Sequence, residues 1–189
     1  NGGVGGYVEA GVKASEGITN NAPLRGGKGM LYEGGVRVPW MAKWPGKIKP
    51  GVVSDVPIIS VDLYPTLLDV AGAKRPEGYT LDGTSFTPQL FGNGGPELEQ
   101  SRYPIYWHFP GYLGSGKDVW RTTPAGSIRA GDWKLIEFFE TGKIELYNLR
   151  DDIGEKTDLA MKMPEKAKEL HDMLVAWRKK VNAPMPQRR

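Results

Sequence analysis

The second half of the chain alternates apolar and polar positions with the period of β-strands. Four short runs carry this pattern, and they are Tyr103 to Phe109, Gly126 to Ala130, Trp133 to Phe139 and Lys143 to Leu149. Two pairs of turn-forming residues, Gly131-Asp132 and Thr141-Gly142, separate the last three runs. Because tight turns join antiparallel neighbours, the pattern predicts a small antiparallel sheet of about four strands.

A longer period begins at Pro164, a favourable first residue for a helix. Apolar residues recur at steps of three and four after it, at Ala167, Leu170, Leu174, Trp177 and Val181. The spacing predicts an amphipathic helix over 164–181. A helix with one apolar stripe must bury that stripe, so we expect it to pack across one face of the predicted sheet.

The first half of the chain is rich in glycine and predicts fewer regular elements. The run Val36 to Trp44 is apolar enough for a buried strand, although Pro39 interrupts it and Pro45-Gly46 ends it. A short helix is predicted further on, with Asp62 as its N-cap and Gly72 as the residue that ends it.

Glycine and proline are frequent over residues 73–101, which we interpret as the junction between two parts of the chain. The predicted domains are therefore 1–95 and 96–189. The fold class predicted is α/β for the first part and α+β for the second, where the short sheet and the helix over 164–181 lie together.

Composition and charge narrow the class of protein. The 189 residues are 39% hydrophobic and 25% charged, which suits a globular chain with a buried core. No run reaches the roughly 18 apolar residues of a membrane span, and the absence of Cys excludes disulfides. The net charge is +3, and its basic excess lies in residues 162–189. No aromatic residues alternate with those charges, so we predict a solvated helix face and no nucleic-acid binding.

One lysine in the first half lies between glycines, in the segment Arg25 to Gly29. Glycine removes the side chains that would keep an anion away from backbone N–H groups, and it permits positive φ in a sharp turn. Lys28 then places a compact ammonium in that loop. A nucleotide-binding P-loop does not fit, because Gly29 stands where that motif requires Ser or Thr.

This loop and several other segments resemble, in the same order along the chain, the C-terminal portion of sulfatases of the arylsulfatase type. That family belongs to the alkaline-phosphatase-like superfamily. The matching segments are Asn1-Gly2-Gly3, Pro23 to Pro39, Trp44 to Ile48, Asp62 to Thr66, Leu81 to Gly83 and Leu146 to Leu149. The resemblance implies the last elements of an alkaline-phosphatase-like sheet domain, followed by a small antiparallel sheet and a C-terminal helix.

The resemblance also implies roles for two residues. In sulfatases an Asp-Asn-Gly element supplies metal ligands, and Asn1-Gly2-Gly3 matches its end. A Lys in the later Arg-Gly-Gly-Lys-Gly loop binds the sulfate, and Lys28 matches it. We therefore expect Asn1 to be a Ca²⁺ ligand in the intact enzyme, and Lys28 to bind sulfate and stabilise charge. The implied substrates are sulfated carbohydrates or aryl sulfates.

Sulfatases use a formylglycine nucleophile made within a Cys/Ser-x-Pro-x-Arg motif, and this sequence contains no such motif. We therefore expect the chain to be a C-terminal fragment whose nucleophile and remaining metal ligands lie in a missing N-terminal portion. The fragment alone is expected to be inactive and to bind no Ca²⁺ more tightly than millimolar. Periplasmic or secreted localisation is a further implication of the resemblance.

Several other residues are candidates for the site. Glu33 and Arg37 are predicted to form a buried ion pair that supports the Lys28 loop. His108 has two interpretations, a leaving-group or substrate contact and a packed strand residue. Trp107, Tyr112 and Trp120 could stack on a sugar or simply belong to the sheet. A cluster of acids, Asp151, Asp152, Glu155 and Asp158, is predicted to be a solvated loop.

Two other functions stay open at this point. One is a phosphodiesterase or phosphonate hydrolase of the same superfold, because the nucleophile that separates these classes is outside the sequence. The other is a non-catalytic module that binds carbohydrate or a partner chain. If the predicted strand Val36 to Trp44 lacks its neighbours, its exposed apolar edge is expected to cause self-association.

Overall fold

The computed structural model describes residues 2–8, 18–92, 104–116 and 119–187. The chain forms two compact units. The first comprises Asn1–Pro39 and Pro104–Arg189, and the second comprises Trp40–Tyr103. The predicted boundary between domains, at residues 95 and 96, lies outside the described residues and stays a prediction.

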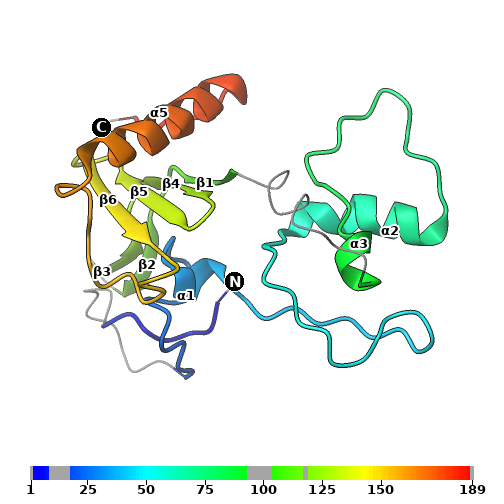
Figure 1. Ribbon diagram of the computed structural model, residues 1–189. Coiled ribbons are helices and arrows are strands. Elements are labelled where there is room, and N and C mark those ends of the chain that lie inside the picture. Colours follow the sequence, from blue (N-terminus) through cyan, green and yellow to red (C-terminus); the bar gives the residue numbers. More distant parts are fainter. Residues whose placement is uncertain (1, 9–17, 93–103, 117–118, 188–189) are drawn as a thin grey trace. The chain divides into compact units, whose positions relative to one another are not determined.

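A four-stranded antiparallel sheet is the centre of the first unit (Figure 1). Its strands, in spatial order, are β1 (Ile105–Phe109), β4 (Ala125–Ala130), β5 (Trp133–Phe138) and β6 (Lys143–Asn148). Gly131 and Gly142, in the two connecting turns, have φ of 61° and 68°, which glycine adopts without strain. The predicted antiparallel sheet and its turns are confirmed.

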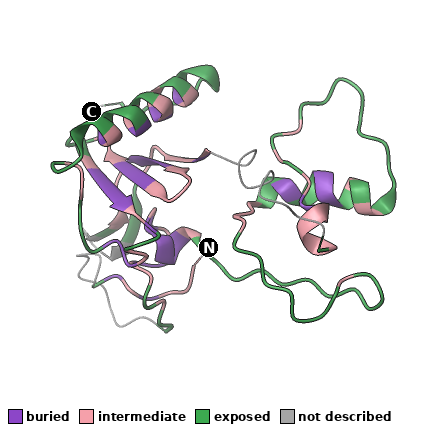
Figure 2. Cartoon of the chain, viewed as in Figure 1, coloured by how far each residue is buried: buried purple, intermediate pink, exposed green. Residues whose placement is uncertain are grey.

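Helix α5 (Pro164–Lys180) covers one face of this sheet, and Pro164 is at its start as predicted. Ala167, Leu170 and Leu174 pack against Ile128, Leu135 and Leu146. The inner side of α5 is buried while its outer side is exposed (Figure 2). Each fully buried Leu contributes roughly 1.5–3 kcal/mol, so this layer is a main source of stability.

The N-terminal segment covers the opposite face of the sheet (Figure 1). Tyr7, Met30 and Tyr32 pack in one cluster with strand residues Ile136 and Tyr147. A short helix, α1 (Glu33–Val36), follows this contact and is largely buried. The segment around Lys28 is therefore held by the sheet of the second half of the chain.

A second, two-stranded sheet consists of β2 (Leu113–Gly116) and β3 (Val119–Thr122). The sequence analysis did not predict this hairpin. Glycine at positions 114 and 116 weakens the strand pattern, and the pairing has irregular register at both positions.

The second unit contains the 3₁₀ helix η1 (Ser60–Asp62), α2 (Leu63–Ala71) and α3 (Thr87–Leu90). Gly72 ends α2 in a left-handed conformation, as predicted. Asp62, however, does not cap α2 through its side chain. Its carboxylate instead accepts hydrogen bonds from the backbone N–H groups of Ile59 and Thr84, which joins two loops.

The strand predicted at Val36 to Trp44 is wrong for this structure. Val36 ends α1, and residues 37–44 form neither helix nor strand. Val38, Trp40, Met41 and Trp44 are exposed. A strand requires a hydrogen-bonded neighbour, and within the described residues none pairs with this run.

In the described ranges, no helix has the length and apolar character needed to cross a membrane.

Candidate functional site

The Lys28 loop turns sharply between two glycines with positive φ, Gly26 at 73° and Gly29 at 93°. Only glycine adopts such values without strain, so this part of the sequence analysis is confirmed. Lys28 is exposed, and its ammonium makes no hydrogen bond or ion pair with any residue that the structure describes. The loop therefore presents one cation that no described carboxylate neutralises.

The segment that begins the chain lies against this loop. The backbone N–H of Lys28 donates to the carbonyl of Gly3 at 2.9 Å, and the N–H of Gly2 donates to the carbonyl of Gly35 at 2.9 Å. Gly2 and Gly3 directly follow Asn1, which is itself outside the described residues. The structure thus brings together the two segments that the sequence analysis identified separately.

Asn21 links these two segments, and the sequence analysis did not identify it. Its side-chain oxygen accepts from the N–H of Gly3 at 3.1 Å. Its amide nitrogen lies within hydrogen-bond distance of the carbonyls of Gly3, Gly5 and Gly26. Nothing in the local sequence indicates this role, because its partners lie up to 18 residues away.

Close backbone approach explains why glycine is so frequent here. A Cβ on Gly2 would lie 1.7 Å from the carbonyl oxygen of Gly34, and one on Gly27 would lie 2.0 Å from that of Gly5. Such distances are far inside van der Waals contact, and the neighbours are backbone atoms that cannot move independently. A side chain at either position would separate the two segments.

The loop is attached to the sheet through a buried lysine. Lys134 of β5 is fully buried, and its Nζ lies 2.8 Å from Glu33 Oε1 and 2.9 Å from Glu155 Oε1. Glu155 also accepts a hydrogen bond from the backbone N–H of Glu33 at 2.7 Å. These three residues, which we call the Lys134 cluster, join α1, β5 and the segment after β6.

Two predictions are corrected by this cluster. Glu33 is buried as predicted, but Arg37 is about half exposed and its Nη1 is 3.9 Å from Glu33 Oε2. The main ionic partner of Glu33 is Lys134, which is distant in sequence. Glu155, predicted to lie in a solvated loop, is fully buried. Its φ of 51° turns the chain so that its carboxylate reaches α1.

The two carboxylates of the Lys134 cluster have opposite pKa shifts. Burial opposes ionisation of Glu33, but Lys134, Arg129 and Arg37 outweigh burial and lower its pKa. Burial dominates at Glu155, where the opposing charge of Lys134 offsets it only in part, and it raises the pKa of that carboxyl. At Glu33, two arginines add to the charge of the buried lysine. At Glu155 they do not, and burial is offset only in part.

A second set of contacts fixes the segment before α1. Arg25 Nη1 donates to the hydroxyl of Tyr147 at 2.9 Å and to the carbonyl of Glu155 at 3.0 Å. The hydroxyls of Tyr32 and Tyr147 each donate to Glu145 Oε2 at 2.8 Å. Burial raises the pKa of both tyrosines, so they remain neutral donors.

His108 lies on the α5 side of the sheet, away from the Lys28 loop. Its Nε2 is 2.7 Å from the carbonyl oxygen of Pro184, to which it donates. Its ring lies 5.4 Å from that of Phe139 and 6.5 Å from that of Trp177, which belongs to α5. These contacts favour the packed interpretation of His108 over a role beside Lys28.

Trp107 and Tyr112, which the sequence also suggested as site residues, do not lie together with His108. Trp107 is half-buried, pairs with Ser127 and, by strand alternation, lies on the face opposite His108. Tyr112 is exposed and its ring lies 5.1 Å from that of Trp120, at an interplanar angle of 55°. Its hydroxyl donates to Glu140. Tyr112 directly precedes Leu113, whose side chain lies against Gly29 of the Lys28 loop.

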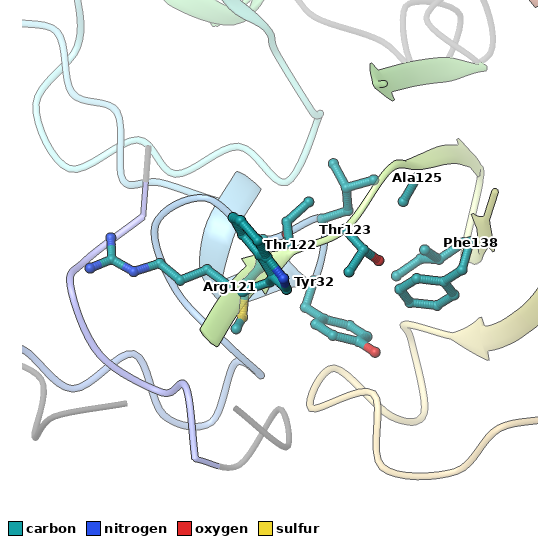
Figure 3. A pocket seen from close by; sticks show the side chains of 10 residues that line it. Tyr32, Arg121, Thr122, Thr123, Ala125 and Phe138 are labelled. Carbon is teal, nitrogen blue, oxygen red and sulfur yellow. The ribbon is translucent and has the colours of Figure 1, made fainter. Parts of the chain in front are cut away.

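A pocket of about 170 Å³ opens beside the loop (Figure 3). Its walls come from residues 30–32, from β3 and the residues after it, and from β5. Among its lining residues, Thr122 and Thr123 lie between Arg121 and Phe138, and the Arg121 side chain points away from Phe138 (Figure 3).

Metal ligands are sparse in the described parts of the chain. Among those residues, no three His, Cys, Asp or Glu side chains form a group that could hold a metal ion. Asn1, the ligand implied by the sequence resemblance, lies outside them.

Comparison with known families gives a match over most of the chain. The family described as "N-sulphoglucosamine sulphohydrolase, C-terminal" matches residues 27–180. A protein named Sulfatase from Formosa agariphila is 40% identical over 181 residues, which cover 89% of this chain and 32% of that protein. Human Arylsulfatase A is 50% identical over 119 residues, covering 63% of this chain and 21% of that protein.

Solved structures agree with the sequence matches. The structure of Ps i-CgsB in complex with k-i-k-neocarrahexaose has a TM-score of 0.66 and 32% identity, and covers 84% of this chain and 32% of that one. A protein in complex with its substrate D-glucosamine-2-N,6-O-disulfate has a TM-score of 0.60 and 29% identity, over 75% of this chain and 28% of that one. The chain spans about a third of the length of such relatives, or less.

Proposed function

This chain belongs to the sulfatase family, as part of its C-terminal region, and from that premise we propose that the intact protein hydrolyses sulfate esters of carbohydrates or aryl alcohols. The observation that carries this proposal is the contact between Gly2-Gly3 and the Lys28 loop. It joins the segment that follows Asn1, the proposed metal ligand, to the segment that carries Lys28, the proposed sulfate-binding residue.

Lys28 has the properties that sulfuryl transfer requires of a charge-stabilising group. Negative charge spreads over the non-bridging oxygens and the leaving oxygen during the transfer, and a cation placed in advance stabilises it. The ammonium of Lys28 is exposed and unpaired among the described residues, so it is available to an anion. The close glycine contacts and the Lys134 cluster hold the loop that presents it.

Family membership supports a metal-dependent enzyme, and we propose Ca²⁺ as the metal. Asn1 would contribute one amide oxygen, a ligand type that suits a hard cation, and the other ligands would come from outside this chain. The metal would polarise a sulfate oxygen when bound. The nucleophile proposed is a formylglycine in the same outside portion. The chain alone would therefore be inactive and would bind Ca²⁺ no more tightly than millimolar.

Sulfated carbohydrate is the substrate class that the relatives favour. One solved relative binds a neocarrahexaose, and another binds a glucosamine disulfate as its substrate. Aryl sulfates remain in the proposal because a human relative is named Arylsulfatase A. A periplasmic or secreted location also remains a proposal.

The test of this function uses the full-length enzyme and 4-nitrophenyl sulfate. Lys28→Ala is expected to lower kcat/KM by about a hundredfold or more, because a preplaced cation is lost from the transition state. Lys47→Ala, which removes another exposed lysine, is the matched control and is expected to stay within about twofold of wild type. Circular dichroism and thermal unfolding should be the same for all three proteins.

Near wild-type kinetics for Lys28→Ala would contradict the role of Lys28. Wild-type enzyme that hydrolyses a phosphonate monoester or phosphodiester faster than the sulfate ester would favour the related hydrolase class instead. Glycan binding without hydrolysis of any ester would favour a non-catalytic module.

A further inference from the structure

Arg121 lies directly beside the Lys28 loop. A Cβ on Gly29 would be 2.2 Å from Leu113 Cδ2 and 3.9 Å from Arg121 Cδ, so the β2–β3 hairpin packs against the loop at this point. Gly29 has no side chain and therefore permits the contact. The hairpin brings the pocket and the Lys28 loop together.

Tyr7 connects the two cations. Its hydroxyl donates to the backbone carbonyl of Lys28 at 3.2 Å, and the guanidinium of Arg121 lies 4.8 Å from the centre of its ring. Tyr7 is buried, so its ring is a fixed surface below Arg121. Cation–π contact of this kind orients a guanidinium without neutralising its charge.

Arg121 has unused hydrogen-bonding capacity. Its Nε is buried and without a hydrogen-bond partner, and in the described ranges the side chain makes no ion pair. A donor left without an acceptor in a protein interior is unfavourable, and the guanidinium that carries it is suited to pair with an anion supplied by a ligand. In Figure 3 the Arg121 side chain extends away from the apolar end of the pocket at Phe138.

An exposed aromatic surface lies next to Arg121 in the same hairpin. Trp120 lines the pocket, and both it and Tyr112, on which it packs, are nearly half exposed. An exposed aromatic ring beside a cation is suited to a sugar that carries a negative group, because the ring takes the apolar face of the sugar and the guanidinium takes the anion.

We propose that Arg121 and Trp120 form a subsite for an anionic sugar residue, bearing a sulfate or a carboxylate, next to the sugar whose ester contacts Lys28. This inference rests on the proposed function and adds to it a preference for polyanionic glycans. Arg121 binds the second anionic group and Trp120 stacks on the ring that carries it. A substrate with one negative group uses Lys28 alone.

The test measures inhibition of 4-nitrophenyl sulfate hydrolysis in the full-length enzyme. Three oligosaccharides of equal length serve as inhibitors: one sulfated, one with uronic acids and no sulfate, and one neutral. For Arg121→Gln we expect the inhibition constant of at least one anionic inhibitor to rise about tenfold or more, and that of the neutral one to change by less than about twofold. The inhibitor affected identifies sulfate or carboxylate as the bound group.

Three further variants separate binding from a structural role. Arg121→Lys keeps the charge without the two-pronged guanidinium, so a smaller rise in the inhibition constant is expected. Trp120→Ala should weaken both the anionic and the neutral inhibitors. Arg150→Gln, which removes an exposed arginine after β6, is the control for loss of one positive charge and should leave all constants within about twofold.

Equal losses in aryl sulfate turnover and in anionic inhibition for Arg121→Gln would assign Arg121 to loop support and overturn the subsite. So would inhibition constants that Arg121→Gln leaves unchanged, or wild-type enzyme that no anionic oligosaccharide inhibits. In these cases aryl sulfate hydrolysis by the wild type would leave the proposed function intact. Wild-type enzyme that hydrolyses no sulfate ester would overturn both.

Discussion

Lys134 shows how a single buried side chain can determine the position of a functional loop. It lies on β5, yet its ammonium contacts carboxylates from α1 and from the segment after β6. A buried charge is tolerated only when it is paired, and here one cation serves two anions. The segment that follows the Lys28 loop is therefore held by a residue of strand β5, far from it in the sequence.

Lys134→Met tests this dependence, because it retains the volume but leaves Glu33 and Glu155 facing each other without their cation. We expect a loss of about 3–5 kcal/mol in the free energy of unfolding at pH 7, measured by urea titration. Lys179→Met, at an exposed lysine of α5, is the matched control and should cost less than about 1 kcal/mol.

The stability lost in Lys134→Met should be larger at neutral pH than at acid pH. In the wild type the lowered pKa of Glu33 adds stability above the unfolded pKa of about 4.5, and this is lost as pH falls through the folded pKa. Without Lys134 both carboxyls favour their neutral form, so the variant loses stability as pH rises above about 4.5. The difference in the free energy of unfolding between wild type and Lys134→Met should become smaller as the pH falls from 7 to 4. A constant difference would contradict this account.

The support of the loop was only partly predictable at the residue scale. Sequence proximity suggested Arg37 as the partner of Glu33, because residues four apart often pair. The observed partner, Lys134, is separated from Glu33 by 101 positions. Asn21 and Glu155 were missed for the same reason, since their roles depend on chain segments that only the fold brings together.

At the scale of elements, prediction succeeded where a local pattern decides the structure. Strands β4, β5 and β6 and helix α5 combine a clear apolar period with clear end signals at Gly131, Gly142 and Pro164. The hairpin β2–β3 has glycine in place of strand-forming residues, and it was missed. The run after Val36 has an apolar pattern but no neighbouring strand, so its prediction was wrong.

Leu174→Ala tests the contact between α5 and the sheet. Leu174 is fully buried against β4, β5 and β6 residues, and its truncation leaves a cavity. We expect the free energy of unfolding to fall by about 2–5 kcal/mol. Val181→Ala, at the half-exposed end of the same apolar series, should cost less than about 1 kcal/mol. Similar losses for the two variants would mean that α5 does not form a core layer with the sheet.

At the scale of the whole molecule, the two units differ in how well they bury apolar side chains. The first has an apolar cluster on each face of its sheet. In the second, large apolar residues such as Trp40, Met41, Val53 and Leu67 are exposed. A surface of this kind favours association with another protein surface.

We therefore expect the 189-residue chain on its own to self-associate. Light scattering should give a mass above the 20.8 kDa of one chain, increasing with protein concentration. A double variant, Met41→Lys with Leu67→Lys, should shift the mass toward the monomer. A monodisperse monomer for the unmodified chain would contradict the expectation. The sequence predicted self-association through the exposed edge of a strand. In the structure the exposed apolar side chains lie on coil and helix and not on a strand edge.

The Lys134 cluster also has a consequence for biosynthesis. Its hydrogen bonds span 101 and 122 positions of the sequence, between Glu33 and its partners Lys134 and Glu155. A chain is made from its N-terminus, so the Lys28 loop leaves the ribosome long before the residues that hold it. Closing so long a loop is slow compared with forming local structure. The surface around Lys28 is therefore completed only after the last strand has been made and has joined the sheet.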